Sequence, residues 1–208
     1  MNAAVPTVFI VDDDQGVLVA LSRLLRASGY ETRTYASPQA LFEHHEPETP
    51  GCLVLDVALP GLSGLELQRA LARSGCDRPI VFITGGGDIP TTVQAMKAGA
   101  VDFLTKPFAD EELLAAVRVA IERDHQSRAA RAGLRSIAER LAMLTQRERE
   151  VLEAVIAGRR NKQIAADLGT VEKTIKVHRA RVMKKMGAES VAELVRLAAH
   201  GGVGTAEF

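Results

Sequence analysis

The stretch that decides the fold is Cys52 to Gly61, CLVLDVALPG, an apolar run that ends on a carboxylate and is then turned by Pro-Gly. An apolar run of this length without alternation predicts a strand that is buried on both faces of a parallel sheet. Its last residue, Asp56, would then emerge at the carboxyl edge of the sheet, where open α/β sheets gather their ligands. Asp56 is therefore the first candidate for a reactive group.

Further strands are predicted on both sides of this stretch. They cover residues 8–11, 31–35, 80–84 and 101–105. Segments with apolar residues at helical spacing lie between them, and strands that alternate with helices of about a dozen residues build a parallel, doubly wound sheet. Residues 7–122 therefore predict an α/β fold with a five-stranded sheet.

From Leu144 onward the pattern changes to helices alone. Thr145 and Glu148 have the spacing of a capping box, and we expect Asn161 and Thr170 to cap the next two helices. Gly169 would turn the chain between those two helices. The pattern predicts a small all-α domain with a helix-turn-helix.

The predicted domains are residues 1–122 and 144–208, joined by a helical linker at 123–143. The linker is highly charged and contains no proline. It would either continue the preceding helix or form a hinge, and its spaced apolar residues favour a helix over a disordered segment.

Composition limits the kind of protein. The chain has 47% hydrophobic and 25% charged residues, which is ordinary for a soluble globular protein. No apolar run approaches the roughly 18 residues needed to cross a bilayer, and the segment Met1 to Thr7 lacks the regions of a signal peptide. Cys52 and Cys76 are not in a metal-binding spacing, so we expect reduced packing residues and a cytoplasmic protein without a membrane partner.

Charge is divided unevenly along the chain. Residues 1–124 carry 10 Lys and Arg against 17 Asp and Glu, a net of −7, whereas residues 125–208 carry 16 against 9, a net of +7. This asymmetry suggests two domains with different partners, the basic one binding a polyanion. Two oppositely charged solvated surfaces would give the same asymmetry.

Reactive polar groups stand at the predicted strand ends. These are Asp12 and Asp13 after the first strand, then Asp56, Thr84 and Lys106 after three others. In a parallel sheet they would converge on one cleft. Carboxylates suit a hard cation such as Mg²⁺, an aspartate can accept a phosphoryl group as a nucleophile, and a lysine can neutralise phosphoryl oxygens.

Four motifs occur in order: Val-Asp-Asp at 11–13, Leu-Asp-x-x-Leu-Pro-Gly at 55–61, Thr-Gly at 84–85 and Lys-Pro at 106–107. With them, the first half of the chain resembles the receiver domain of two-component response regulators, which has a flavodoxin-like fold. The second half contains LTQREREVL at 144–152, NKQIA at 161–165 and TIKVHR at 174–179, and it resembles a LuxR-type DNA-binding domain. The whole chain is similar to the FixJ type of the NarL/LuxR class.

The resemblance implies a role for each residue of the site. Asp56 would accept phosphate from a sensor histidine kinase. The ligands of Mg²⁺ would be Asp12, Asp13, Asp56 and the backbone carbonyl of Ala58. Thr84 is similar to the switch hydroxyl of the family, Lys106 to its phosphate-pairing lysine and Phe103 to its switch aromatic.

The resemblance also implies a mechanism and partners. Phosphorylation would move Thr84 and let Phe103 turn inward, which would alter the face made by residues 89–108. In the FixJ type this face dimerises. The expected partners are therefore the histidine kinase, double-stranded DNA, RNA polymerase and a second copy of the chain.

The helix predicted from Val171 to Met186 has two opposite stripes. The buried one would contain Val171, Ile175, Val182 and Met186, and the outward one Lys173, Lys176, Val177, Ala180 and Lys184. A basic face with small apolar residues suits the major groove. Lys176, Val177 and Ala180 match the base-reading positions of LuxR-type domains, although Ala180 is too short to donate a hydrogen bond. The other expected DNA-binding residues are Lys173, Thr174, Arg181 and Lys184, of which Lys173, Arg181 and Lys184 would contact phosphates.

Two alternatives to a phosphorylation-switched transcription factor remain. A phosphatase that uses Asp56 as nucleophile would typically carry an acid two residues later, but that residue is Ala58. A DNA-binding protein that is independent of phosphorylation would not need Asp56, Thr84 and Lys106 together. The sequence therefore favours a regulator over an enzyme.

Overall fold

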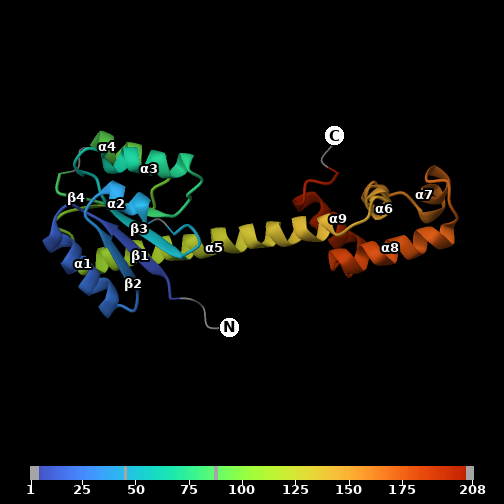
Figure 1. Cartoon of the computed structure of the whole chain (residues 1–208), viewed down its shortest axis with the longest axis horizontal. Coiled ribbons are helices and arrows are strands. Elements are labelled where there is room, and N and C mark those ends of the chain that lie inside the picture. The colour runs from blue at the N-terminus through green and yellow to red at the C-terminus, as the bar shows by residue number, and fades with distance from the viewer. Residues whose placement is uncertain (1–4, 45, 87–88, 205–208) are drawn as a thin grey trace. The chain divides into compact units, whose positions relative to one another are not determined.

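The computed structural model describes residues 5–44, 46–86 and 89–204. The chain divides into two compact units, Met1–Arg128 and Ala129–Phe208. The first holds a sheet with helices on both faces, and the second consists of helices (Figure 1).

The sheet has five parallel strands in the order β2-β1-β3-β4-β5. Their bounds are β1 Thr7–Val11, β2 Glu31–Tyr35, β3 Gly51–Asp56, β4 Ile80–Thr84 and β5 Asp102–Thr105. The predicted five-stranded parallel sheet is confirmed, and this strand order is that of flavodoxin-like folds. β3 occupies the centre, and all six of its residues are buried.

Helices cover both faces of the sheet (Figure 1). Apolar residues of α1 (Gln15–Ala27) and α5 (Asp110–Ala142) pack on one face. Those of α2 (Pro38–Glu43), α3 (Gly64–Arg73) and α4 (Ile89–Lys97) pack on the other. Successive side chains of a strand point to opposite faces, so β3 needs apolar residues at consecutive positions, as the sequence has them.

Cys52 is one of these packing residues. Its side chain is fully buried, and burial raises the pKa of its thiol to about 12. The thiol is therefore neutral and contributes to the core as a small apolar group. Cys76 is partly exposed, and neither cysteine forms a disulfide.

α5 is one continuous helix of 33 residues. It begins at Asp110 in the first unit and runs to Ala142, so residues 123–142 continue the preceding helix rather than form a hinge. The division between the two units falls within this helix, after Arg128.

Among its described residues, the second unit has four further helices. They are α6 Gln146–Ile156, α7 Asn161–Asp167, α8 Glu172–Met186 and α9 Val191–His200. The helix-turn-helix pair is α7 and α8, which pack on a core that includes Val151, Ile164, Ile175 and Leu194.

Of the predicted caps at Thr145, Asn161 and Thr170, the first is correct and the other two are wrong. Thr145 and Glu148 form the capping box at the start of α6. Asn161 does not cap α7, because it is the first residue of that helix and its side-chain oxygen accepts a hydrogen bond from Arg179 at 3.1 Å. Thr170 does not cap α8, since the N-cap is Val171.

Glu148 also forms a nearly buried ion pair. Its side chain is 3% exposed, and the Lys185 ammonium lies 2.6 Å from its Oε2 atom. The hydrogen bonds from Lys185 and from the Thr145 amide lower the pKa of Glu148 to about 2. Through this carboxylate, the start of α6 is tied to the end of α8.

This pKa predicts how the second unit responds to acid. The folded state lowers the pKa of Glu148 below its ordinary 4.5, so its contribution to stability is present above pH 4.5 and is lost as the pH falls towards 2. We expect Glu148→Gln to be less stable at neutral pH and to lack this part of the acid dependence. Thermal unfolding of the full chain followed by circular dichroism from pH 7 to 2 measures both. Glu153→Gln, on the exposed side of α6, is the control, and equal acid dependence in Glu148→Gln and the wild type would contradict the assignment.

Candidate functional site

The carboxyl edge of the sheet carries the polar groups that the sequence placed there. Asp12 directly follows β1, Asp56 ends β3, Thr84 ends β4, and Lys106 follows β5. Three of these residues are almost completely buried: Asp12 is 1% exposed, Asp56 4% and Thr84 1%. The parallel topology therefore brings together residues that are up to 94 positions apart.

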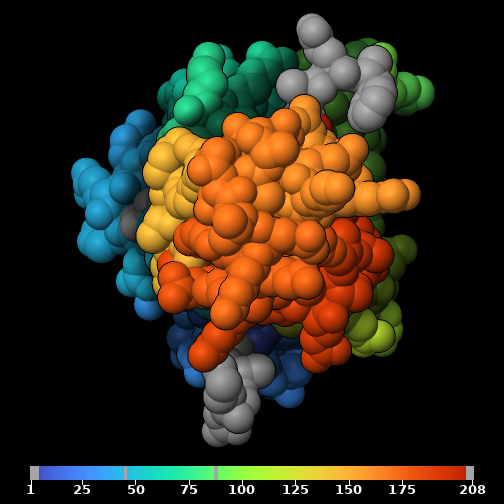
Figure 2. Space-filling model, turned by 90° about the vertical axis from the view of Figure 1, so that its right-hand side faces the viewer, coloured from blue at the N-terminus to red at the C-terminus, as the bar shows by residue number. Residues whose placement is uncertain are grey.

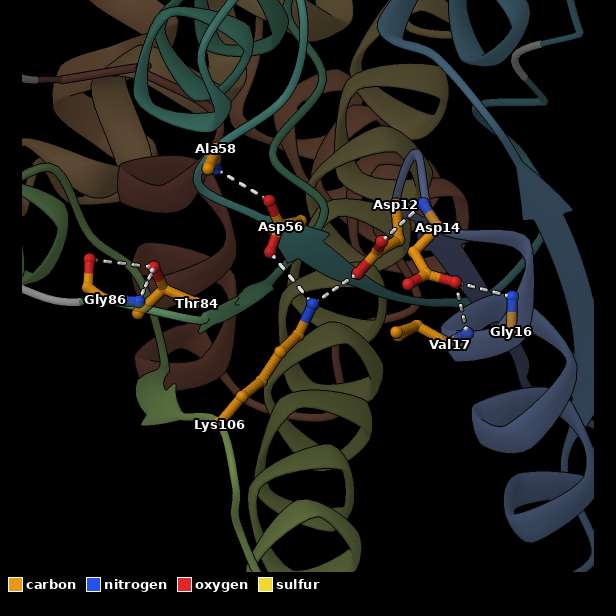
Figure 3. A network of polar contacts seen from close by, with 9 residues as sticks. All are labelled: Asp12, Asp14, Gly16, Val17, Asp56, Ala58, Thr84, Gly86 and Lys106. Atoms are coloured by element: carbon orange, nitrogen blue, oxygen red, sulfur yellow. Dashed lines mark hydrogen bonds and ion pairs between the residues drawn. The ribbon is translucent and has the colours of Figure 1, made fainter.

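The centre of the site is the Lys106 ammonium, which lies between two carboxylates (Figure 3). Its Nζ atom donates to Oδ2 of Asp12 at 2.7 Å and to Oδ1 of Asp56 at 3.1 Å. Burial by itself would lower the pKa of the ammonium, but the hydrogen bonds to Asp12 and Asp56 outweigh it and raise the pKa above the ordinary 10.5. The ammonium is therefore charged at neutral pH and offsets the repulsion between the two carboxylates.

Backbone amides hold the remaining carboxylate oxygens. Oδ2 of Asp56 accepts a hydrogen bond from the Ala58 amide at 2.7 Å, and Oδ1 of Asp12 accepts one from the Asp14 amide at 2.9 Å. Asp14 is the N-cap of α1, where its side chain accepts from the amides of Gly16 and Val17. Both reactive carboxylates are thus fixed in orientation by the turns that follow their strands.

The capping role of Asp14 is not among the predictions made from the sequence, which name only Asp12 and Asp13 after the first strand. The signal was present, since an aspartate directly before a helical pattern is a preferred N-cap.

Three residues of the predicted site stand apart from this network. The Thr84 hydroxyl bonds to the backbone of Gly86, donating to its oxygen at 3.2 Å and accepting from its nitrogen at 3.3 Å (Figure 3). Asp13 is exposed. Phe103 is partly buried in β5, and its ring centroid lies 6.2 Å from that of Phe82.

The carboxylates at this edge of the sheet are the side chains that could hold a metal ion. Among residues 5–44, 46–86 and 89–204, no group of three or more His, Cys, Asp and Glu side chains is arranged to hold an ion. Magnesium keeps several waters and usually takes only one or two protein carboxylates. Asp12 and Asp56, which share the Lys106 ammonium as hydrogen-bond donor, meet that smaller requirement, so the residues present fit a magnesium ion.

A second candidate site is the outward face of α8. Ile175, Val182 and Met186 are fully buried, as the sequence predicted. Val171 is 64% exposed and does not belong to the buried stripe, because it is the N-cap and lies before the first helical turn.

The predicted outward residues of α8 are exposed. They are Lys173, Lys176, Val177, Ala180, Arg181 and Lys184, while Thr174 is partly exposed. The residues of α7 and α8 form the orange surface that faces the viewer in Figure 2. Glu172 lies one turn before Lys176, with a carboxylate oxygen 3.6 Å from its ammonium. Apart from that carboxylate, the charged side chains named on this face are lysines and an arginine, which suits the binding of a polyanion.

Models of two protein families match the chain. The one described as the response regulator receiver domain matches residues 8–118, and the one described as bacterial regulatory proteins of the luxR family matches residues 142–198. The chain belongs to the response regulators with a LuxR-type DNA-binding domain.

Relatives of nearly the same length support this family. Nodulation protein W of Bradyrhizobium diazoefficiens is 47% identical over 94% of this chain and 86% of its own. Transcriptional regulatory protein FixJ of Azorhizobium caulinodans is 43% identical over 96% and 95%. The solved structure of the response regulator StyR has a TM-score of 0.88 and 47% identity, and it covers 94% of this chain and 99% of StyR.

Membership of this family indicates the general function of the chain and two kinds of partner. A response regulator of this kind has a histidine kinase and DNA as partners, and the relative FixJ is a transcriptional regulatory protein. Within the described residues, none of the helices has both the length and the apolar character that a membrane span requires.

The lysine between two carboxylates predicts a stability effect. Removing one partner of a buried ion pair costs roughly 3–5 kcal/mol, and since 25% of the Lys106 side chain is exposed, we expect Lys106→Gln to lose about 1–3 kcal/mol at pH 7. Urea unfolding measures this loss. The control is Lys97→Gln at the exposed end of α4, and equal losses in the two variants would show that Lys106 does not hold the carboxylates together.

Proposed function

We propose that Asp56 is the phosphoacceptor of this response regulator and that its phosphorylation controls DNA binding by the LuxR-type domain. The observation that carries the proposal is the Lys106 ammonium, which bridges Asp12 and Asp56 at the carboxyl edge of the sheet. In this proposal the receiver covers residues 1–122, the linker 123–143 and the DNA-binding domain 144–208.

The chemistry is a phosphoryl transfer. A carboxylate oxygen of Asp56 attacks phosphorus, a P–O bond forms, and the P–N bond to the imidazole of the kinase histidine breaks. The imidazole leaves with the electron pair and takes up a proton. Such a transfer needs positioning and charge neutralisation above all. The hydrogen bond from the Ala58 amide positions the Asp56 carboxylate, and the Lys106 ammonium neutralises negative charge.

A bound Mg²⁺ would neutralise phosphoryl oxygens that Lys106 does not reach. Asp12, Asp13, Asp56 and the Ala58 carbonyl are the proposed ligands. Asp12 and Asp56 are already oriented by backbone amides. Asp13 adds an exposed carboxylate next to Asp12 in the chain.

Thr84 and Phe103 are the proposed switch. Among the described residues, the hydrogen-bond partners of the Thr84 hydroxyl are both backbone atoms of Gly86, so it can exchange these two bonds for one to a phosphoryl oxygen on Asp56 at little cost. Its movement would vacate space for the partly buried Phe103. Phosphorylation then acts as a population shift, because the phosphoryl group binds one arrangement better than the other.

The face at residues 89–108 is the proposed dimer interface of the phosphorylated protein. It exposes Ile89 by 80% and both Val93 and Met96 by 43%. Exposed apolar side chains that lie close together are typical of protein interfaces. We place the protein in the cytoplasm, with RNA polymerase as a further partner of the DNA-bound dimer.

The α8 face is the proposed reader of DNA. Lys176, Val177 and Ala180 would face base edges in the major groove, the lysine as a donor to guanine and the two apolar residues against thymine methyl groups. Lys173, Thr174, Arg181 and Lys184 would contact the backbone and fix the register. The exposure of all these residues except the partly covered Thr174 supports this use.

The phosphoacceptor assignment predicts a mass change. Incubation with acetyl phosphate and Mg²⁺ should add one phosphoryl group, about 80 Da, to the wild type and to Asp110→Asn but not to Asp56→Asn. Intact-protein mass spectrometry measures it, and sedimentation of the same samples should show a dimer only where mass was gained. An unchanged wild-type mass, or a gain in Asp56→Asn, would refute the assignment.

The DNA-reading assignment predicts different losses along α8. Lys176→Ala should weaken binding to the operator by about 1–3 kcal/mol more than binding to unrelated DNA. Lys173→Ala should weaken both equally and lower the slope of log affinity against log salt by about 1. Fluorescence anisotropy over a salt series separates the two, and equal losses on both DNAs would reassign Lys176 to a phosphate contact.

A further inference from the structure

The loop that leads into β3 is held by two arginines from elsewhere in the receiver. This loop, residues 46–50, directs four of its backbone carbonyls at them. It precedes the amino end of β3, whereas Asp56 ends that strand at the opposite edge of the sheet. The two arginines are therefore outside the phosphoacceptor site.

Arg128 makes the larger share of these contacts. Its Nη2 atom donates to the carbonyls of Pro47 at 2.9 Å and Thr49 at 3.0 Å, and Nη1 donates to that of Glu48 at 3.1 Å. Its Nε atom donates to Asp124, one turn earlier on α5, at 2.8 Å. One guanidinium thus binds three consecutive carbonyls and a carboxylate.

Asp124 extends the connection to the strand itself. It is 2% exposed, and its Oδ2 atom accepts both the Arg128 bond and a bond from the Gly51 amide at 2.9 Å. Gly51 is the first residue of β3, and Asp56 is the last. A charged hydrogen-bond acceptor on α5 therefore holds the strand that ends in the phosphoacceptor.

Arg78, two residues before β4, also binds this loop. Its Nη2 atom donates to the carbonyls of Glu46 at 2.7 Å and Thr49 at 2.8 Å, and its guanidinium lies 3.9 Å from the centroid of the Phe9 ring. Arg78 is buried and makes no contact with α5 among these bonds. Arg78 fixes the loop within the receiver, whereas the three bonds of Arg128 tie the loop to α5.

We propose that Asp124 and Arg128 are positioning residues that couple β3 to α5, so that the state of Asp56 reaches the LuxR-type domain through this helix. The proposal rests on the proposed function of Asp56. Arg128 is the last residue of the first compact unit, and α5 continues beyond it without a break to Ala142. Asp124 and Arg128, here called the clamp, add polar bonds to the apolar packing of α5 on the sheet and fasten the helix where the first compact unit ends.

The bonds of Asp124 and Arg128 are stronger than those of an exposed ion pair. An exposed i,i+4 pair contributes little to stability, but here Asp124 is 2% exposed and every bond involves a charged group, which makes each stronger. The flat guanidinium also reaches three carbonyls at once, which the single nitrogen of a lysine cannot do.

The test compares Arg128→Gln and Arg128→Lys with the wild type. Arg123→Gln is the matched control, since Arg123 is an exposed arginine of α5 with one 3.4 Å bond to the Gly99 carbonyl and none to the loop. DNA affinity is measured by anisotropy with and without acetyl phosphate and Mg²⁺, and the phosphorylated fraction of each sample by intact mass. Hydrogen exchange is measured on the unphosphorylated proteins.

In the wild type and Arg123→Gln, phosphorylation should raise DNA affinity within the roughly 5- to 150-fold range usual for coupled sites. In Arg128→Gln and Arg128→Lys, the ratio of DNA affinity with phosphorylation to that without should fall to about 1. The phosphorylated fraction and the DNA affinity of the unphosphorylated protein should be unchanged. Exchange of the Gly51 amide and of α5 beyond residue 128 should be faster in both variants.

The outcomes separate the two proposals. A wild-type ratio in Arg128→Gln, or full restoration by Arg128→Lys, overturns the coupling role and leaves the function of Asp56 intact. Failure of the wild type to gain mass overturns the function of Asp56. In that case the clamp is tested by hydrogen exchange alone. If the Gly51 amide and α5 exchange as slowly in Arg128→Gln as in the wild type, the clamp is refuted as well.

Discussion

The receiver depends on one electrostatic constraint: Asp12 and Asp56 are nearly buried side by side, and each oxygen of these two carboxylates needs a partner. Lys106 supplies one bond to each, and the backbone amides of Asp14 and Ala58 supply the others. Unpaired buried charges would cost several kcal/mol each. The turn after β1, the turn after β3 and the loop after β5 are therefore held in fixed positions relative to one another. The site is rigid before a phosphoryl group binds.

The same strand that carries Asp56 is fixed at its other end by a different set of charges. Asp124 and Arg128 bind the first residue of β3 and the loop before it. Both ends of one buried strand are thus held by ionic hydrogen bonds, while its middle is held by apolar packing on two faces. Such a strand has little freedom to change alone, so a change at Asp56 has to be taken up by the elements bonded to it.

In the LuxR-type domain, charged side chains hold the ends of the helices in place. Its helices are short, and its core is closed by side chains that bind helix ends. Arg140 donates to the Met186 carbonyl, Arg149 to that of Leu141, and Lys185 to Glu148. With the end of α8 held from inside the domain, the basic residues on its outer face are left to bind DNA.

The sequence by itself determined the order of elements, the central buried strand and the residues at its carboxyl edge, because apolar periodicity and the rule for parallel strand ends are local or topological. It also identified the capping box of α6, which needs only four residues in a row. It could not find the caps of α7 and α8, because Asn161 is engaged by Arg179 from another helix and Val171 caps without a side-chain bond. Only the tertiary structure decided that Lys106 bridges Asp12 and Asp56, that α5 is unbroken, and that Arg128 meets the loop before β3. The contacts of Lys106 and Arg128 join residues 50 to 94 positions apart, and no spacing rule reaches that far. The continuity of α5 was left open because a charged segment without proline can form either a helix or a hinge.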